Sequence, residues 1–225
     1  MDSEWITREL NHAALKSRQR QVRNDLPPNL SLRIHRALSW LEAAEQQVGN
    51  PDARFIFLWI AFNAAYANEI EDRQAFGEKR VLLNFLDILL RADAQNWIDH
   101  IVWNEFPRSI RLLLSNKYVF QKFWDYHNGK ISEQEWLVAF EQGQAIANRA
   151  LGRMQTVKVL AIVFDRLYTL RNQLIHGGAT WNSSVNREQI RDGANFLRLL
   201  VPAVIHIMLN NQPPIIGHPC YPVVE

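Results

Sequence analysis

The run from Ala53 to about Ile70 most constrains this fold, because its segment FIFLWIAFNAAYA is apolar on nearly every side of a helix. A helix that is apolar all round is stable only when other elements surround it. Asn50, Pro51 and Asp52 precede it, supplying a capping side chain, a proline whose missing N–H costs nothing there, and a carboxylate at the positive helix end. The sequence therefore predicts that a central helix begins here.

Most other segments repeat their apolar residues at helical spacing, and strand-type alternation is hard to find in the sequence. Nine glycines and nine prolines fall mostly between these segments, as expected of residues that end helices. We expect further helices over Glu4–Arg23, from a cap at Ser31 to Gly49, over Gly77–Leu90, over Ala94–Asn128 with a break near Pro107, from a Ser132–Glu135 capping box toward His176 with an interruption at Gly143 or Gly152, and from Asn186 onward with a kink at Pro202.

The fold class that follows is all-α, a bundle of about six or seven helices. We expect an N-terminal helical segment in residues 1–29, one helical domain in residues 30–211 and a proline-rich tail in residues 212–225. Lys and Arg total 25 against 23 Asp and Glu, so any site for a polyanion must be local. The single cysteine, Cys220, and the absence of an export signal or a membrane-spanning apolar stretch favour a cytoplasmic protein that does not associate with membranes.

The helix that ends at His176 carries the pattern most suggestive of chemistry. One face is polar and the opposite one apolar, and Arg171 lies on the flank of the apolar stripe. Arg171 and His176 are separated by about 140° around the axis, at roughly 100° per residue, so they meet only across the helix end. The polar face comprises Asp165, Thr169, Asn172 and His176, and the apolar stripe comprises Leu160, Val163, Leu167, Leu170 and Leu174.

This pair suits the cleavage of a phosphodiester. Arginine presents a permanently charged donor pair that fits a phosphate, and histidine transfers protons near neutral pH. In RNA the 2′-hydroxyl group can act as the nucleophile, so the reaction needs proton transfer and charge stabilisation but no metal or other cofactor. The alternative is an ordinary helix end, in which His176 lies in the last turn and Gly177 adopts the left-handed conformation. Spacing alone does not separate the two interpretations.

Two further features are open to a structural or a functional interpretation. Asn63 is the one amide among large apolar residues of the central helix, so it either forms a buried hydrogen bond between helices or helps to orient a site. Between Ala94 and Asn128, aromatic residues alternate with Lys and Arg, a pattern that fits stacking on single-stranded nucleic acid as well as a hydrophobic core. The residues concerned are Trp97, Trp103, Arg108, Arg111, Lys117, Tyr118, Lys122, Phe123 and Trp124.

The segment Arg171-Asn172-Gln173-Leu174-Ile175-His176 resembles the motif of the HEPN superfamily, an Arg and a His separated by four to six residues near a helix end. Its context, RNQLIHGGATWNSSVNREQ, and the upstream FIFLWIAFNAAYA are similar to the Apea-like HEPN branch over about residues 30–211. The resemblance implies a HEPN-like fold and a metal-independent endoribonuclease without cofactor. It also implies a homodimer, in which two motifs share one cleft, and a role in defence or in toxin–antitoxin pairs.

Within that resemblance each candidate residue has an expected role. His176 would be the general acid or base, Arg171 would hold the scissile phosphate, and Asn172 would orient or bind it. We place Asn63, together with Thr169 and Asp165, among residues that contact RNA or support the site. Gly178 stands where toxins silenced by a nucleotidyltransferase often have a tyrosine, so such regulation is not expected. The alternatives are a non-catalytic HEPN module that binds RNA, a nucleotide or a protein, and a purely structural helical dimer.

Overall fold

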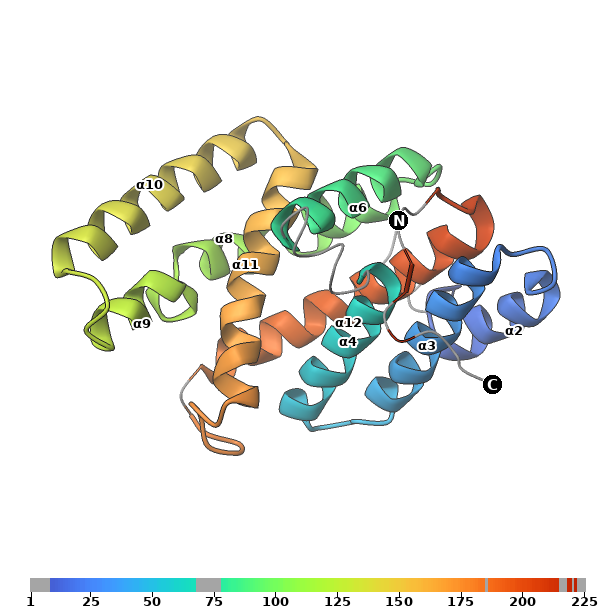
Figure 1. Ribbon diagram of the computed structural model, residues 1–225, viewed down its shortest axis with the longest axis horizontal. Coiled ribbons are helices and arrows are strands. Elements are labelled where there is room, and N and C mark those ends of the chain that lie inside the picture. The colour runs from blue at the N-terminus through green and yellow to red at the C-terminus, as the bar shows by residue number, and fades with distance from the viewer. Residues whose placement is uncertain (1–8, 68–77, 185, 215–217, 220, 222–225) are drawn as a thin grey trace.

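The computed structural model describes residues 9–67, 78–184, 186–214, 218, 219 and 221. Over these residues the chain forms ten α-helices, one π-helix and one 3-10 helix, and no strand (Figure 1). The all-α class is confirmed, but the predicted number of six or seven helices is too low. The elements are α2 (His12–Val22), α3 (Pro28–Glu45), α4 (Pro51–Tyr66), α6 (Glu78–Ala92), α7 (Trp97–His100), the π-helix η1 (Ile101–Glu105), α8 (Pro107–Ser115), the 3-10 helix η2 (Lys117–Val119), α9 (Gln121–His127), α10 (Glu133–Gly152), α11 (Thr156–Ile175) and α12 (Arg187–Asn211).

The predicted central helix is α4, which packs between α3 and α12 and also contacts α11 (Figure 1). The Asn50 side chain accepts a hydrogen bond from the Ala53 amide at 3.1 Å, Pro51 is the first helical residue and Asp52 lies in the first turn, as predicted. The helix ends at Tyr66, and the rest of the expected extension toward Ile70 lies largely outside the described residues.

Two predicted helix starts are wrong. α3 begins at Pro28, so Ser31 lies inside the helix and does not cap it. The reason is that proline fits the first helical position, where its missing N–H has no partner to lose. α2 begins at His12, where the Asn11 side chain accepts from the Ala14 amide at 3.0 Å, so the expected continuous helix over Glu4–Arg23 is interrupted before this cap.

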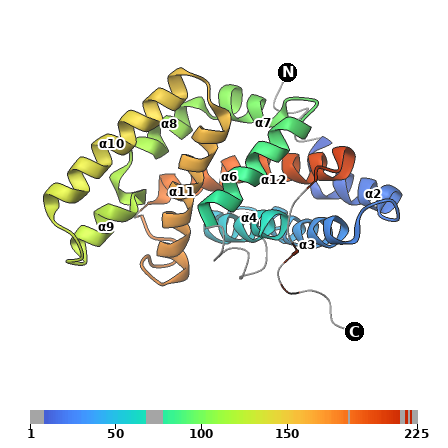
Figure 2. The ribbon, with the colours of Figure 1, turned by 45° about the horizontal axis from the view of Figure 1, so that its top comes forward.

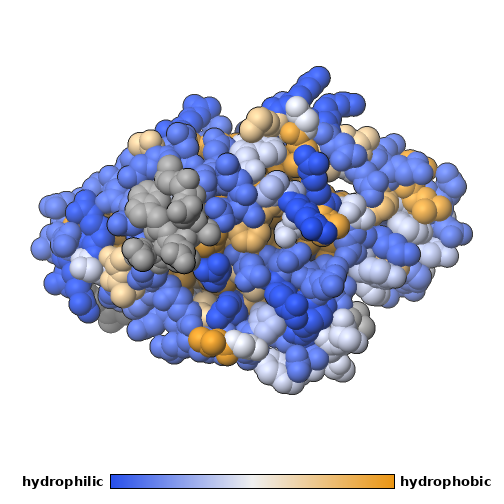
Figure 3. Space-filling view, turned by 180° about the vertical axis from the view of Figure 1, so that it is seen from behind, coloured by the Kyte–Doolittle hydropathy of each residue, from blue (hydrophilic) through white to orange (hydrophobic). Residues whose placement is uncertain are grey.

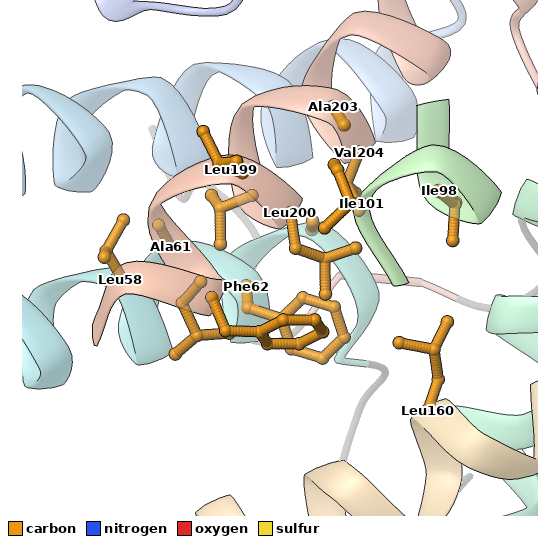
Figure 4. Packing of buried hydrophobic residues seen from close by; sticks show 14 of the residues in the cluster. Leu58, Ala61, Phe62, Ile98, Ile101, Leu160, Leu199, Leu200, Ala203 and Val204 are labelled. Atoms are coloured by element: carbon orange, nitrogen blue, oxygen red, sulfur yellow. The ribbon is translucent and has the colours of Figure 1, made fainter. Parts of the chain in front are cut away.

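The hydrophobic core lies where α4, α12, α11 and the α7–η1 segment meet. Figure 4 shows Phe62 of α4 beneath Leu200 of α12, with Ile101 and Leu160 close by. The most apolar window of α12 has a mean hydropathy of 1.3 and is long enough to span a membrane, but 78% of it is buried inside the protein. We therefore describe α12 as the core helix of the bundle. Pro202 lies within it, and the kink expected there stays a prediction.

At one end of the molecule, α10 packs on α8, α9 and α11, and α8 also packs on α11 (Figures 1 and 2). α10 and α11 are separate helices because the chain breaks at Met154, whose φ is +50°. Of the two interruptions considered, the break therefore follows Gly152, and Gly143 stays helical. Seen from behind, the surface is mostly hydrophilic, with apolar side chains in small patches (Figure 3).

Replacing Ser132 with alanine is expected to lower the free energy of unfolding by about 1 kcal/mol, because the capping box at the start of α10 is complete. The Ser132 Oγ accepts from the Glu135 amide, and the Glu135 carboxylate accepts from the Ser132 amide at 2.7 Å. Urea denaturation measures the loss, and Ser31→Ala is the matched control. Ser31 lies inside α3, so a comparable loss in both variants would contradict this assignment.

Candidate functional site

The candidate site lies where α11 ends. His176 is the C-terminal cap, and its backbone N–H donates to the carbonyl of Asn172 at 3.0 Å. Gly177 follows with φ +70°, a conformation that glycine adopts without strain. A Cβ atom on Gly178 would lie 3.2 Å from the Gln173 carbonyl oxygen, so the second glycine leaves room for the chain to fold back over the helix end. The two glycines thus fix the position at which α11 stops.

Arg171 is half-buried, and its donors are only partly used. Its Nη1 donates to the Asn172 Oδ1 at 2.9 Å, whereas its Nε is buried and has no hydrogen-bond partner. No carboxylate of the described residues forms an ion pair with it. A guanidinium group in this state keeps its charge available to an anionic ligand, because no carboxylate neutralises it.

The His176 side chain is exposed and forms no hydrogen bond or ion pair within the described part of the chain. It also makes no hydrogen bond to Arg171, in keeping with the predicted angular separation of the two residues. The predicted pair therefore lies on one helix end, but the two side chains are not joined to each other. A ligand or another protein surface is needed to engage both at once.

The predicted polar face of α11 is not continuous. The Thr169 side chain is buried, and its hydroxyl donates to the backbone carbonyl of Asp165 at 3.3 Å. Thr169 is therefore not available at the surface as the helical pattern suggested, because neighbouring helices cover that side of α11. Asp165 is exposed and forms an ion pair with the Arg166 Nη1 at 2.9 Å. Among the described residues of this face, only Asn172 forms a hydrogen bond with Arg171.

Asn63 lies on α4, half-buried, and its carbonyl accepts the Ala67 amide at the helix end. Within the described residues its side chain has no hydrogen-bond partner, so the first of the two alternatives, a buried hydrogen bond between helices, is not formed there. Among the described residues, no hydrogen bond joins the Asn63 side chain to the Arg171 side chain.

Sequence reasoning missed Gln173 as a connecting residue. Its Nε2 donates to the carbonyl of Tyr118 at 2.7 Å, and its Oε1 accepts from the Asn186 Nδ2 at 2.6 Å. It therefore ties the end of α11 to η2 and to the residue that precedes α12. The motif itself contains Gln173, but no local pattern indicates partners that lie 55 and 13 residues away.

Arg166 is a second residue that the sequence did not single out. Only 2% of its side chain is exposed, and its guanidinium carbon lies 4.4 Å from the centre of the Phe120 ring. Burial lowers the pKa of this guanidinium, and the neighbouring Asp165 carboxylate acts in the opposite direction. Its guanidinium packs against Phe120, which lies between η2 and α9, so Arg166 joins α11 to the α8–α10 end.

The aromatic and basic segment after Ala94 is divided between core and surface. Trp97 and Phe123 are buried, as the core interpretation predicts. Tyr118 is 46% exposed, and the Lys117 Nζ lies 5.3 Å from the centre of its ring. Both line an open cavity of about 660 Å³ between α8, η2 and the start of α12, a cavity that also includes Asn186. This cavity adjoins the end of α11 through the hydrogen bond from Asn186 to Gln173.

Among the described residues, no group of three or more His, Cys, Asp or Glu side chains is arranged to hold a metal ion. No protein-family model, no curated protein sequence and no solved structure matches this chain. The assignment to the HEPN superfamily therefore stays a prediction that depends on the quoted motif and its context.

Proposed function

We propose that this chain is a metal-independent endoribonuclease of the HEPN type, which cleaves RNA by attack of a 2′-hydroxyl group on the adjacent phosphate. The observation that carries the proposal is that the two motif side chains, Arg171 and His176, are left available for a ligand. Arg171 has no carboxylate partner among the described residues and keeps a buried Nε without a hydrogen bond, while His176 is exposed at the same helix end. A charged donor and an imidazole at one helix end can supply charge stabilisation and one of the two proton transfers of this reaction.

In the proposed reaction a base removes the proton of the 2′-hydroxyl group, and the resulting oxygen attacks the phosphorus. The bond from phosphorus to the 5′-oxygen breaks, and the leaving oxygen takes up a proton. The products are a 2′,3′-cyclic phosphate and a 5′-hydroxyl end. His176 performs one of the two proton transfers, and Arg171 binds the phosphate oxygens whose negative charge grows in the transition state. Asn172 orients Arg171 through the hydrogen bond of 2.9 Å.

The second proton transfer requires another group, which a second copy of the chain supplies in this proposal. Tyr168 and Ile175 support such a homodimer, because these apolar residues of α11 are 43% and 47% exposed. They are seven positions apart, with Arg171 between them on the same side of the helix. Two copies packed through this face bring two motifs into one cleft. A defence or toxin–antitoxin setting, with a partner that restrains cleavage, fits this activity.

A second candidate function is RNA binding without cleavage, by a HEPN module that has lost its activity. The observation that favours it is the absence of any hydrogen bond between Arg171 and His176 in the described residues, with one donor of Arg171 already engaged by Asn172. Under this alternative the cationic side chain holds a phosphate, but no proton is transferred.

Purified protein in excess EDTA is expected to cleave an RNA pool and to leave the same pool intact when it is fully 2′-O-methylated, because the methyl group removes the nucleophile. Product ends are analysed by mass spectrometry, which distinguishes a cyclic phosphate from a 3′-hydroxyl end. Cleavage of the methylated pool, or products with 3′-hydroxyl ends, would contradict the proposed reaction. Binding of both pools without cleavage of either would favour the non-catalytic alternative.

A further inference from the structure

A cavity of about 300 Å³ lies between the start of α4 and the start of α12. Three arginines line it, Arg54 from α4 and Arg187 and Arg191 from α12, and no carboxylate is among the residues of its wall. Gly49, Asn50 and Pro51 line the same cavity, so the positive end of α4 adjoins it. Three guanidinium groups and a helix N-terminus together make a site for an anion.

The positive charge of this cavity is only partly compensated. Arg187 forms an ion pair with Asp52, at 2.9 Å from Nη1 to Oδ2, and its Nε donates to the carbonyl of Ser183. In the described part of the chain neither Arg54 nor Arg191 forms an ion pair. The Arg54 Nε and the Arg187 Nη2 are buried donors without a hydrogen-bond partner. Asp52 thus pairs with one of the three arginines, and the other two form no ion pair among the described residues.

The charge extends along the same face of α12. Arg187, Arg191 and Arg198 follow at spacings of four and seven, which places them on one side of a helix. Burial and the nearby charge of Arg54 lower the pKa of Arg198, whereas Glu105 and Glu45 act in the opposite direction. Arg54 therefore lies close enough to Arg198 for their charges to interact, and it shares the cavity with Arg187 and Arg191. An extended anion gains more from such a row than a compact ion does.

The loop between α11 and α12 links this cavity to the helix end that carries the candidate site. Asn182, from the loop between α11 and α12, is part of its wall. The Asn186 side chain donates to Gln173, and the next residue is Arg187. Trp181, beside Asn182 in the chain, is 72% exposed and available for stacking against a base. No aromatic side chain is among the residues of the cavity wall itself, so it offers a phosphate site and not a base pocket.

We propose that this cavity binds a backbone phosphate of an RNA strand, next to the phosphate that is cleaved at Arg171 and His176. The inference rests on the proposed function and adds to it a subsite that positions the substrate. Arg54 and Arg191 supply the free donors, and Arg187 is held in place by Asp52. The subsite explains how a chain with a net charge of only +2 retains a polyanion.

The test is the binding of a fully 2′-O-methylated RNA oligonucleotide, which cannot react by 2′-hydroxyl attack, measured by fluorescence anisotropy over a series of salt concentrations. Arg54→Gln/Arg191→Gln is expected to weaken binding by roughly tenfold or more, and to reduce the slope of log K against log salt by about 0.7, the value for one lost phosphate contact on a single strand. Arg149→Gln/Arg153→Gln removes the same charge from exposed positions near the junction of α10 and α11 and should change neither value by more than a small fraction.

Arg191→Gln alone serves as a second variant, since this side chain is exposed and its loss leaves the core intact. Unchanged affinity and slope in both cavity variants would overturn the proposal. The proposal would also be overturned if inorganic phosphate bound through these arginines without competing with the oligonucleotide. Arginine-dependent binding by a protein that cleaves no RNA supports the subsite and contradicts only the proposed catalysis. If the cavity variants cleave RNA at the wild-type rate, only the subsite is contradicted.

Discussion

Replacing His176 with alanine is expected to slow RNA cleavage at least ~100-fold, which is the lower range for the loss of a general acid or base. The side chain is exposed and forms no hydrogen bond or ion pair with the described residues, so its removal leaves the fold unchanged. The cap of α11 also persists, because it uses the backbone N–H of residue 176. A loss of rate without a loss of stability therefore reports on chemistry. Initial cleavage rates in EDTA measure the effect.

Arg171→Ala is expected to reduce the rate to a similar degree, because the growing charge on the phosphate loses its donor. His35→Ala and Arg153→Ala are matched controls, since both side chains are exposed and lie on other elements. Equal rates for all four variants would contradict the assignment of His176.

The sequence predicted the local signals of this fold well. The start of α4 and the capping box of α10 each depend on side chains within a few residues of the backbone groups that they satisfy. The groups that stabilise each of these two helix starts therefore all lie within a short segment of the sequence. By contrast, Gly143 and Gly152 look alike in the sequence, and only tertiary packing separates them. A Cβ on Gly143 would lie 3.7 Å from the Arg166 Nη2, so this half-buried glycine packs against α11, and α10 continues through it.

The candidate site was predictable only in part. The helix end at His176 follows from the glycines, but the burial of Thr169 does not, because α11 contacts α4, α6, α8 and α10 on different sides. The arginine-lined cavity was missed for a related reason. Its residues come from segments 49–54 and 182–195, and each arginine alone resembles an ordinary charge on a helix surface. Only the packing of α12 against α4 brings them together.

Replacing Phe62 with alanine is expected to lower the free energy of unfolding by about 3–5 kcal/mol, the usual range for a fully buried phenylalanine. Phe62 is 1% exposed, stacks on Phe164 of α11 with ring centres 4.1 Å apart, and meets Phe85 of α6 edge-on at 6.0 Å. Its removal leaves a cavity where the central helix meets both partners. Because Phe164 lies on the helix that ends in the motif, this contact also fixes α11 against the core.

Phe57→Ala is the matched control, since Phe57 lies on the same helix but is only half-buried and contacts the partly exposed Trp40 at 5.6 Å between ring centres. We expect its loss of stability to be less than half that of Phe62→Ala, because less apolar area leaves the interior and the space can be filled by water. Urea denaturation with a common slope measures both values. Equal losses would mean that the contact of α4 with α11 and α6 is no more important for stability than its outer face toward α3.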